Sequence, residues 1–263
     1  MNTEHVVKIY TDYREEDRFS TDNARKLEFI TSVKAIGETI NPNSNILDCA
    51  AGTGAYVFYL HDKGHTVTAL DITPRHVDII NESKGTRNIA ASVNDARDLS
   101  TFGDDSFDVV LCMGPLYHLT ESSDRLKCLN ECKRVLKTGG ILISAYINRL
   151  FIIPQIISQD KKFIDSNVIA QLLESGSMSH DDEFCFWTDT YFSTPEDMEL
   201  VYNEMDLDIA DHIAADGVSI LKRDMVNSMN EDEFKIWCEY HYSTCREKSI
   251  LGISNHGLIF GRK

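Results

Sequence analysis

The chain has no apolar run approaching the roughly 20 residues that a membrane-spanning helix requires. Its first residues also lack a basic segment leading into an apolar stretch, the pattern of a secretory signal. No basic cluster is present, and 42 Asp and Glu outnumber 26 Lys and Arg over 263 residues. Nucleic-acid binding draws much of its affinity from Lys and Arg that neutralise phosphates, so this balance disfavours RNA and DNA. We therefore predict a cytoplasmic protein without membrane or nucleic-acid partners.

Paired Cys-x-x-Cys motifs are also missing, although the chain has seven cysteines. An odd number of scattered cysteines is typical of reduced, packed thiols rather than a disulfide framework. The spacing Cys238-x-x-His241-x-x-x-Cys245 brings three soft ligands to about one face of a helix, where His256 could complete a zinc site. Because aromatic residues flank these positions, as on an ordinary apolar helix face, we favour core packing and predict no metal.

A glycine-containing turn links the first expected strand to a helix. The strand ends in Asp48, residues 52–54 are Gly-Thr-Gly, and residues 55–64 have the composition of an amphipathic helix. Such a turn points backbone N–H groups and the positive end of the helix dipole at a bound ligand. The next expected strand, residues 65–70, ends in Asp71, where a carboxylate can accept hydrogen bonds from ribose hydroxyls. This pattern indicates a nucleoside-binding βαβ unit.

The turn departs from the dinucleotide fingerprint, which has a third glycine three residues after the second. That position is Val57 here. The departure weakens a dinucleotide interpretation without excluding it, since a ligand with a carboxylate in place of a pyrophosphate needs less room. A nicotinamide-dependent reductase remains an alternative.

Strand-like and helical segments alternate through residues 24–148, which predicts a parallel sheet covered by helices on both faces. One of the helices begins near Ser122, and we expect Lys137 in its last turn and Gly139 and Gly140 at its C-terminal cap. A later helix is expected over residues 195–204. The expected strands are 46–48, 65–70, 88–93, 107–113, 141–147, 207–213 and 258–260.

We interpret the chain as a single domain made of successive parts. Residues 1–23 form an N-terminal flap or a solvated helix, and residues 24–148 form the cofactor-binding core. Residues 149–206 are an aromatic-rich insertion, which we expect to act as a lid over a substrate pocket; extra packing layers are the alternative. Residues 207–263 complete the sheet and carry a helical insertion over 215–250.

The order of the motifs carries a family resemblance. The motifs are Asp48-x-x-x-Gly52-x-Gly54, Asp71, Asn94-Asp95-Ala96, Ser106-Phe107-Asp108 and the run Arg-Val-Leu-Lys-Thr-Gly-Gly at 134–140. In this order they resemble class I S-adenosylmethionine-dependent methyltransferases over roughly half of the chain. The likeness is greatest to the small-molecule branch, where a similar run with proline in place of Thr138 is common. It implies a Rossmann-like α/β fold: a seven-stranded, mostly parallel sheet whose antiparallel last strand lies between the fifth and sixth, with lid insertions after strand five and between strands six and seven.

The resemblance also implies that S-adenosylmethionine binds over the carboxyl ends of the first, second and fourth strands. The turn would hold the methionine portion, Asp71 the ribose hydroxyls and Asp95 the adenine edge, although Asp95 could instead cap a turn. Tyr13 in the flap is expected to close the site. The complete expected set is Asp48, Ala50, Gly52, Thr53, Gly54, Asp71, Ile72, Asp95, Ala96, Cys112, Met113, Gly114 and Tyr13.

Candidate catalytic residues follow from the chemistry of methyl transfer. Methyl transfer from a sulfonium is an in-line displacement, so alignment of the reactants and exclusion of water can supply most of the catalysis. A general base is required only if the methyl acceptor must lose a proton. Tyr117 and His118 follow the fourth strand, and His118 could act as a base or only bond the next helix. If the last strand is antiparallel, its beginning brings His256 near the pocket. We predict Tyr117, His118 and His256 as catalytic residues.

These observations together predict a methyltransferase that acts on a small molecule, as a monomer or a homodimer. Residues 114–117, Gly-Pro-Leu-Tyr, lack the amide or carboxylate of the Asn/Asp-Pro-Pro-Tyr/Phe motif of amino-group methyltransferases. This departure argues against methylation of DNA adenine or of protein glutamine. A protein or RNA methyltransferase and a non-catalytic nucleoside-binding module remain the alternatives.

Overall fold

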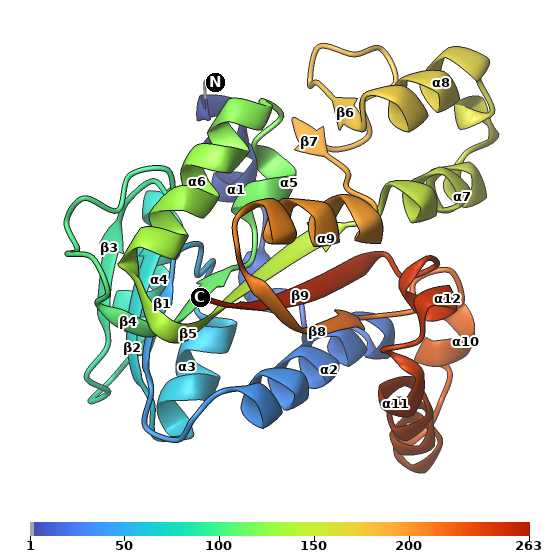
Figure 1. Cartoon of the computed structure of the whole chain (residues 1–263). Coiled ribbons are helices and arrows are strands. Elements are labelled where there is room, and N and C mark those ends of the chain that lie inside the picture. The colour runs from blue at the N-terminus through green and yellow to red at the C-terminus, as the bar shows by residue number, and fades with distance from the viewer. Residues whose placement is uncertain (1–2) are drawn as a thin grey trace.

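The centre of the protein is a seven-stranded sheet with the order β3-β2-β1-β4-β5-β9-β8 (Figure 1). The structure is a computed structural model and describes residues 3–263. The strands from β3 to β5 pair in parallel, and β9 runs antiparallel to both β5 and β8. The bounds are β1 (Asn45–Asp48), β2 (Thr66–Asp71), β3 (Ala90–Val93), β4 (Phe107–Cys112), β5 (Leu136–Ile147), β8 (Asp208–Ala214) and β9 (His256–Arg262). The expected fold class is confirmed, including the antiparallel last strand.

Helices cover both faces of this sheet, as the alternating sequence predicts. One face carries α2 (Asn23–Thr39), α3 (Ala55–Asp62) and α4 (Pro74–Ser83), whose apolar side chains share one buried cluster with the sheet. The other face carries α6 (Ser122–Val135) and α9 (Pro195–Glu204), which contribute to a second buried cluster. Helix α9 spans the expected residues because the Thr194 side chain caps it in a capping box with Asp197.

The expected end of the helix after Ser122 is wrong. Helix α6 ends at Val135 and β5 begins at Leu136, so the following residues belong to a strand. The reason lies in the last residue of the chain: the N–H of Gly139 donates to the Lys263 carbonyl at 2.7 Å, and the Lys263 N–H donates to the Gly140 carbonyl at 3.1 Å. A Cβ atom at Gly140 would lie 2.8 Å from the carbonyl oxygen of Asp108. Gly140 thus permits the close approach of the neighbouring strand, Gly139 adopts a φ of 79° where a Cβ atom would meet nothing within 4 Å, and neither residue caps the helix.

Residues 149–192 form a separate lobe beside the sheet (Figure 1). The lobe has its own buried apolar cluster, which includes Ile152, Leu172 and Phe192. The expected insertion extended to residue 206, but α9 packs on the sheet instead. The elements of the lobe are α7 (Arg149–Gln159), η2 (Lys161–Phe163), α8 (Ser166–Glu174), β6 (Ser177–Met178) and β7 (Thr190–Tyr191).

The remaining helices come before the first strand of the sheet, between β4 and β5, or between β8 and β9. They are α1 (Glu4–Asp12), η1 (Glu15–Asp17), α5 (Pro115–His118), α10 (Arg223–Asn227), α11 (Glu231–Thr244) and α12 (Lys248–Leu251). Residues of α10 and α11 pack on α2 through Val226 and Phe234. No helix within residues 3–263 is both long enough and apolar enough to cross a bilayer.

The candidate zinc spacing Cys238-x-x-His241-x-x-x-Cys245 lies in and just after α11. Nε2 of His241 is 3.1 Å from the carbonyl oxygen of Ala214, and the Cys245 thiol lies 3.2 Å from the carbonyl oxygen of Tyr242. Cys238 packs against the cluster that joins α11 to α2. Each of the three side chains therefore has a packing role in this part of the molecule.

Candidate cofactor and acceptor site

The turn between β1 and α3 requires glycine at both ends. Gly52 and Gly54 have positive φ angles of 53° and 93°, a region that other residues rarely adopt. A Cβ atom at Gly54 would also lie 2.9 Å from Phe58 and 3.0 Å from Ile80. Glycine here lets the chain turn from the strand directly into α3, whose N-cap is Gly54.

Asp71 at the end of β2 ties this turn to the start of α4. Its Oδ2 accepts a hydrogen bond from the Gly52 N–H at 2.8 Å, and its Oδ1 accepts from the Thr73 N–H at 2.8 Å. Nδ1 of His76 lies 3.1 Å from the same Oδ1. Each carboxylate oxygen has two lone pairs, so Oδ2 keeps one for a ligand hydroxyl. The buried Nε2 of His76 has no partner among residues 3–263.

A pocket of about 760 Å³, partly open to solvent, lies over the carboxyl ends of β1, β2 and β4. We call it the first pocket. Its walls combine the Asp71 carboxylate, the backbone of the glycine turn, the side chain of Asp95 and apolar surface from Ile72. Carboxylates for sugar hydroxyls, backbone for a charged tail and apolar surface for a base are the groups that an adenosine-bearing methyl donor requires. The residues present fit S-adenosylmethionine.

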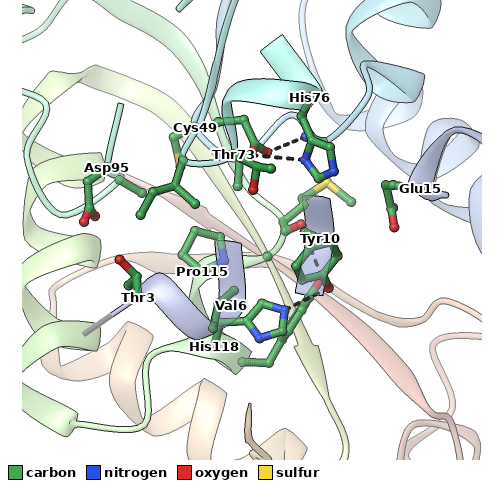
Figure 2. A pocket seen from close by; sticks show the side chains of 18 of the residues that line it. Thr3, Val6, Tyr10, Glu15, Cys49, Thr73, His76, Asp95, Pro115 and His118 are labelled. Atoms are coloured by element: carbon green, nitrogen blue, oxygen red, sulfur yellow. Dashed lines mark hydrogen bonds and ion pairs between the residues drawn. The ribbon is translucent and has the colours of Figure 1, made fainter. Parts of the chain in front are cut away.

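Helix α1 covers the first pocket (Figure 2). Val6 and Tyr10 from this helix line it, as does Thr3 at its N-cap. The Tyr10 hydroxyl lies 2.9 Å from Nε2 of His118 in α5, and Figure 2 shows this bond as a dashed line. Through Tyr10, helix α1 therefore contacts α5, the short helix that follows β4.

His118 is half-buried at the inner end of this contact. Its Nδ1 lies 3.2 Å from the carbonyl oxygen of Asp189, which can only accept, so this nitrogen carries the proton. Burial lowers the pKa of His118 to about 4, so the ring is neutral near pH 7 and Nε2 is an acceptor. Burial raises the pKa of the neighbouring Tyr117 to about 12, which keeps its hydroxyl protonated.

A second pocket of about 990 Å³, also partly open, adjoins the first. Tyr10, Glu15, Arg18, Tyr117 and His118 line both pockets. The residues 149–192 and the start of β9 supply much of the rest of the wall, which includes Ile152, Gln155, Phe186, Trp187, Phe192, Asn255 and His256.

His256 lies at the start of β9, on the edge of the second pocket. Its Nδ1 is 2.8 Å from Oδ2 of Asp216 and 3.5 Å from a carboxylate oxygen of Glu28. Burial would lower the pKa of His256, but the carboxylates of Glu28 and Asp216 outweigh it and raise this pKa. The imidazolium is therefore the favoured form over a wider pH range than in an exposed histidine.

Arg18 links the two pockets electrostatically. One guanidinium nitrogen donates to both carboxylate oxygens of Glu28, at 2.8 and 3.0 Å. Another lies 3.6 Å from Glu15. Burial raises the pKa of Glu15, and Arg18 opposes this rise. Charged groups thus alternate in sign from Glu15 through Arg18 and Glu28 to His256 and Asp216.

Residues 47–144 match a protein family described as a methyltransferase domain. The chain carries a methyltransferase domain. The putative methyltransferase YqeM of Bacillus subtilis is 31% identical over 112 residues, which make up 42% of this chain and 45% of the relative. Glycine/sarcosine N-methyltransferase of Parasynechococcus marenigrum is 34% identical over 107 residues, 40% of this chain and 38% of that protein. The chain thus spans less than half the length of these curated relatives.

Solved structures of methyltransferases share the fold. A SAM-dependent methyltransferase from Methanosarcina mazei superposes with a TM-score of 0.61 at 18% identity, over 87% of this chain and 96% of that chain. A putative S-adenosylmethionine-dependent methyltransferase from Listeria monocytogenes gives 0.60 at 14% identity, over 90% and 99%. The domain match agrees with the expected resemblance to class I methyltransferases, and the solved structures confirm the Rossmann-like fold that the resemblance implied.

The methyltransferase domain brings most of the expected cofactor residues to the first pocket. One of these residues is Asp95. Burial alone would raise the pKa of its carboxylate, but hydrogen bonds from Arg97 outweigh this effect and lower the pKa. The Arg97 N–H also donates to Asp95 at 2.8 Å, so this residue holds its turn as well as lining the pocket. The expected residues that line the pocket are Ala50, Gly52, Asp71, Ile72, Asp95, Ala96, Met113 and Gly114.

The other expected cofactor residues do not line the first pocket, and their roles in binding stay predictions. Asp48 is buried behind the turn, where burial raises its pKa well above the ordinary value; its carboxylate accepts from the Ala50 N–H at 3.3 Å. Cys112 faces the core, with its Sγ 3.7 Å from that of Cys128. Thr53 is half-buried in the turn, and Gly54 is buried against Phe58 and Ile80.

Tyr13 lies on the second pocket, and Tyr10 takes the covering position over the first. The Tyr13 hydroxyl accepts from Arg25 at 3.2 Å. The sequence offered both tyrosines of the flap and we chose Tyr13 for the site, whereas Asp216 was missed. A signal for Asp216 was available, because it closely follows the strand that pairs with the start of β9, where His256 was expected.

Proposed function

We propose that the protein transfers a methyl group from S-adenosylmethionine in the first pocket to a small-molecule acceptor in the second. The observation that carries this proposal is the wall common to both pockets, which includes Tyr117 and His118. Because the pockets share these lining residues, ligands bound in them would lie next to each other. In-line displacement requires that the acceptor atom approach the methyl group from the side opposite the sulfur.

The chain's own residues would bind and orient the cofactor. The Asp71 carboxylate, with its spare lone pair, accepts from the ribose, and backbone carbonyl groups of the turn at Gly52 accept from the ammonium group of the amino-acid tail. When bound, the cofactor supplies an electrophilic methyl group on a sulfonium. Tyr10 and Val6 of α1 exclude water from this side.

His118 is suited to accept a proton from the acceptor when the reaction requires it. Its neutral ring keeps Nε2 as an acceptor on the wall common to both pockets. In the closed arrangement the Tyr10 hydroxyl bonds this nitrogen, so a proton can reach it through the hydroxyl or directly after Tyr10 turns away.

The net charge of the chain and the aromatic lining of the second pocket support the proposal of a small acceptor. A formal net charge of −16 disfavours phosphate-rich polymers. The second pocket is roofed by Trp187 and Phe186 of the insertion and by Tyr10 and Tyr13 before α2. These aromatic walls suit a compact molecule with apolar surface, and several matched relatives are named for small-molecule acceptors.

Calorimetry and a transfer assay test the proposal. We expect the full chain to bind S-adenosylmethionine and its demethylated product and not to bind NAD or NADP. Radiolabelled S-adenosylmethionine with pools of small amines, phenols and carboxylic acids should then identify an acceptor class. Preferential binding of NAD would overturn the cofactor assignment, and transfer only to protein or RNA would overturn the small-molecule proposal.

A further inference from the structure

Two arginines line the second pocket and are not part of the wall of the first. Arg25 belongs to α2, and Arg223 is the first residue of α10. Both lie at the same carboxylate, that of Asp22, which accepts from the Arg25 backbone N–H at 2.9 Å and from the Arg223 guanidinium. Two guanidinium groups therefore share one carboxylate at this end of the second pocket, which we call the outer end.

The guanidinium of Arg25 makes no ion pair within residues 3–263. It donates to the neutral hydroxyl of Tyr13 at 3.2 Å. A guanidinium has five N–H donors and keeps its proton at any ordinary pH, so most of these donors remain for a ligand. Arg25 is half-buried and the Arg223 side chain is 43% exposed, so a ligand can reach the outer end from solvent.

The third arginine of the second pocket, Arg18, is already opposed by carboxylates. It donates to both oxygens of Glu28 at 2.8 and 3.0 Å, and it lies 3.6 Å from Glu15. A Cβ atom at Gly52 would lie 3.5 Å from Cγ of Glu15, which places this carboxylate beside the glycine turn of the first pocket. The excess of positive charge in the second pocket is therefore confined to its outer end.

Aromatic rings connect the outer end with the wall common to both pockets. Tyr13, the partner of Arg25, packs edge-on against Trp187 with ring centroids 5.2 Å apart. Trp187 packs in the same way against Tyr10 at 6.4 Å, and Tyr10 lines both pockets. This arrangement matches a molecule with an anionic end and an apolar or aromatic body.

We propose that the methyl acceptor is a carboxylic acid with an apolar or aromatic body, whose carboxylate binds Arg25 beside Arg223. This inference rests on the proposed function and names the class of its acceptor. A guanidinium can donate two parallel hydrogen bonds to a carboxylate. With the body along the aromatic rings, the opposite end of the molecule lies at Tyr117 and His118, where the first pocket begins.

A phosphate ester is less suited to the outer end than a carboxylate. The two guanidinium groups and Asp22 leave one positive charge there, which a carboxylate neutralises. A phosphate monoester carries a charge of roughly −1.5 to −2 near neutral pH. Its additional charge would be repelled by Asp22 and by Glu28, which also lines this pocket.

Calorimetry without cofactor tests the carboxylate site on the full chain. The probes are 3-phenylpropionate, its neutral amide 3-phenylpropionamide and 2-phenylethyl phosphate. We expect the acid to bind at least about tenfold more tightly than the other two probes. R25M should lose this preference, and R25K should keep part of it, because lysine retains the charge without the planar fork.

The matched control for this titration is R87M. Arg87 pairs with Asp62 outside both pockets, so the variant has the same net charge as R25M and should bind like the wild type. Absence of binding by the acid, equal binding of acid and amide, tighter binding of the phosphate, or an unchanged preference in R25M would each overturn the proposal.

D22N should change the affinity in the opposite direction. Asn caps a helix about as well as Asp, so the start of α2 should be retained. Without the carboxylate, both guanidinium groups are unopposed, and we expect the acid to bind up to about fivefold more tightly. Equal or weaker binding by D22N would contradict the shared carboxylate.

Kinetics with the acceptor found in the transfer assay test the position of the carboxylate. We expect R25M to raise KM for this acceptor at least about tenfold with little change in kcat, because the carboxylate binds away from the transferred methyl group. An acceptor without a carboxylate, or a fall in kcat alone, would overturn the proposal. Failure of the probes to bind while S-adenosylmethionine still binds would refute only the carboxylate site, whereas failure of S-adenosylmethionine to bind would refute the proposed function.

Discussion

Asp71 shows how much of the site rests on one carboxylate. It accepts hydrogen bonds from the N–H groups of Gly52 and Thr73, and it faces the first pocket. The residue was predictable because a strand that ends in an acidic residue after a glycine turn is a local pattern. The bond from Gly52 was not, because it depends on how β1 and β2 pair.

Replacing this carboxylate with an amide should weaken the cofactor site. In D71N one side-chain oxygen becomes an amide N–H₂ group that faces a backbone donor or the ribose. Loss of a hydrogen bond to a charged group costs about 1.5–3 kcal/mol, so we expect roughly 10- to 150-fold weaker S-adenosylmethionine binding by calorimetry. The matched control is D78N, since Asp78 is exposed on α4; equal affinities of the two variants would contradict the role of Asp71.

The charge on His256 should appear in the pH dependence of stability. Glu28 and Asp216 raise its pKa in the folded protein. Its stabilising contribution is therefore complete below the unfolded value of about 6.5 and is lost as pH rises through the higher folded pKa. We expect urea denaturation of the wild type to show this loss as pH rises above about 6.5 and H256Q to lack it. An H61Q control should behave like the wild type, and an identical pH profile for H256Q would contradict the ion pairing.

The residues of this ion-pair network are far apart in the sequence, which explains why the sequence alone indicated only His256. The network joins Arg18 at the end of η1, Glu28 in α2 and Asp216 in the loop after β8. No short spacing links them. Only the antiparallel last strand, a family expectation, indicated that His256 would reach the pocket.

At the scale of elements, β9 is packed so closely that its glycines are required. A Cβ atom at Gly257 would lie 2.2 Å from the ring of Tyr146 in the neighbouring strand β5. Local sequence patterns predicted that a strand would lie here, but its contacts with α9 and β5 depend on the complete fold. The same limit explains the error at residues 136–140, where a Lys-Thr-Gly-Gly sequence typical of a helix end pairs instead with Lys263.

Substitution of this glycine should displace the strand. Overpacking typically costs about 1–3 kcal/mol, so we expect G257A to lower the free energy of unfolding by this amount and to reduce methyl transfer through the adjacent His256. The control is G37A in the middle of α2, where a Cβ atom meets nothing within 4 Å. Helix propensity should make G37A neutral or stabilising by up to about 1 kcal/mol in urea denaturation. A destabilised G37A together with an unaffected G257A would contradict this packing analysis.

At the scale of the whole molecule, the alternating strands and helices made a parallel, helix-covered sheet predictable, and the family resemblance implied the place of its antiparallel last strand. The lobe of residues 149–192 was not predictable in this way. Its aromatic residues indicated an insertion, but not that it would enclose a cluster apart from the two that flank the sheet. A separate cluster with short strands provides less cooperative stabilisation than the main sheet.

We therefore expect amide hydrogen exchange to be faster in the lobe than in β4 and β5. L172A removes a fully buried side chain from the lobe, and L142A removes one from the sheet. Each should cost about 2–5 kcal/mol locally. Exchange should accelerate only within the lobe for L172A and throughout the molecule for L142A. Uniform acceleration by both variants, measured by mass spectrometry, would show that lobe and sheet unfold together.

The position of Tyr10 has a kinetic consequence. This side chain belongs to the walls of both chambers, and it sits on a helix joined to the body by the few residues of η1. If this helix swings away, both pockets open together, so cofactor entry and product release would depend on the same motion. Turnover would then be paced by the hinge near residue 13 whenever the chemical step is faster than the swing.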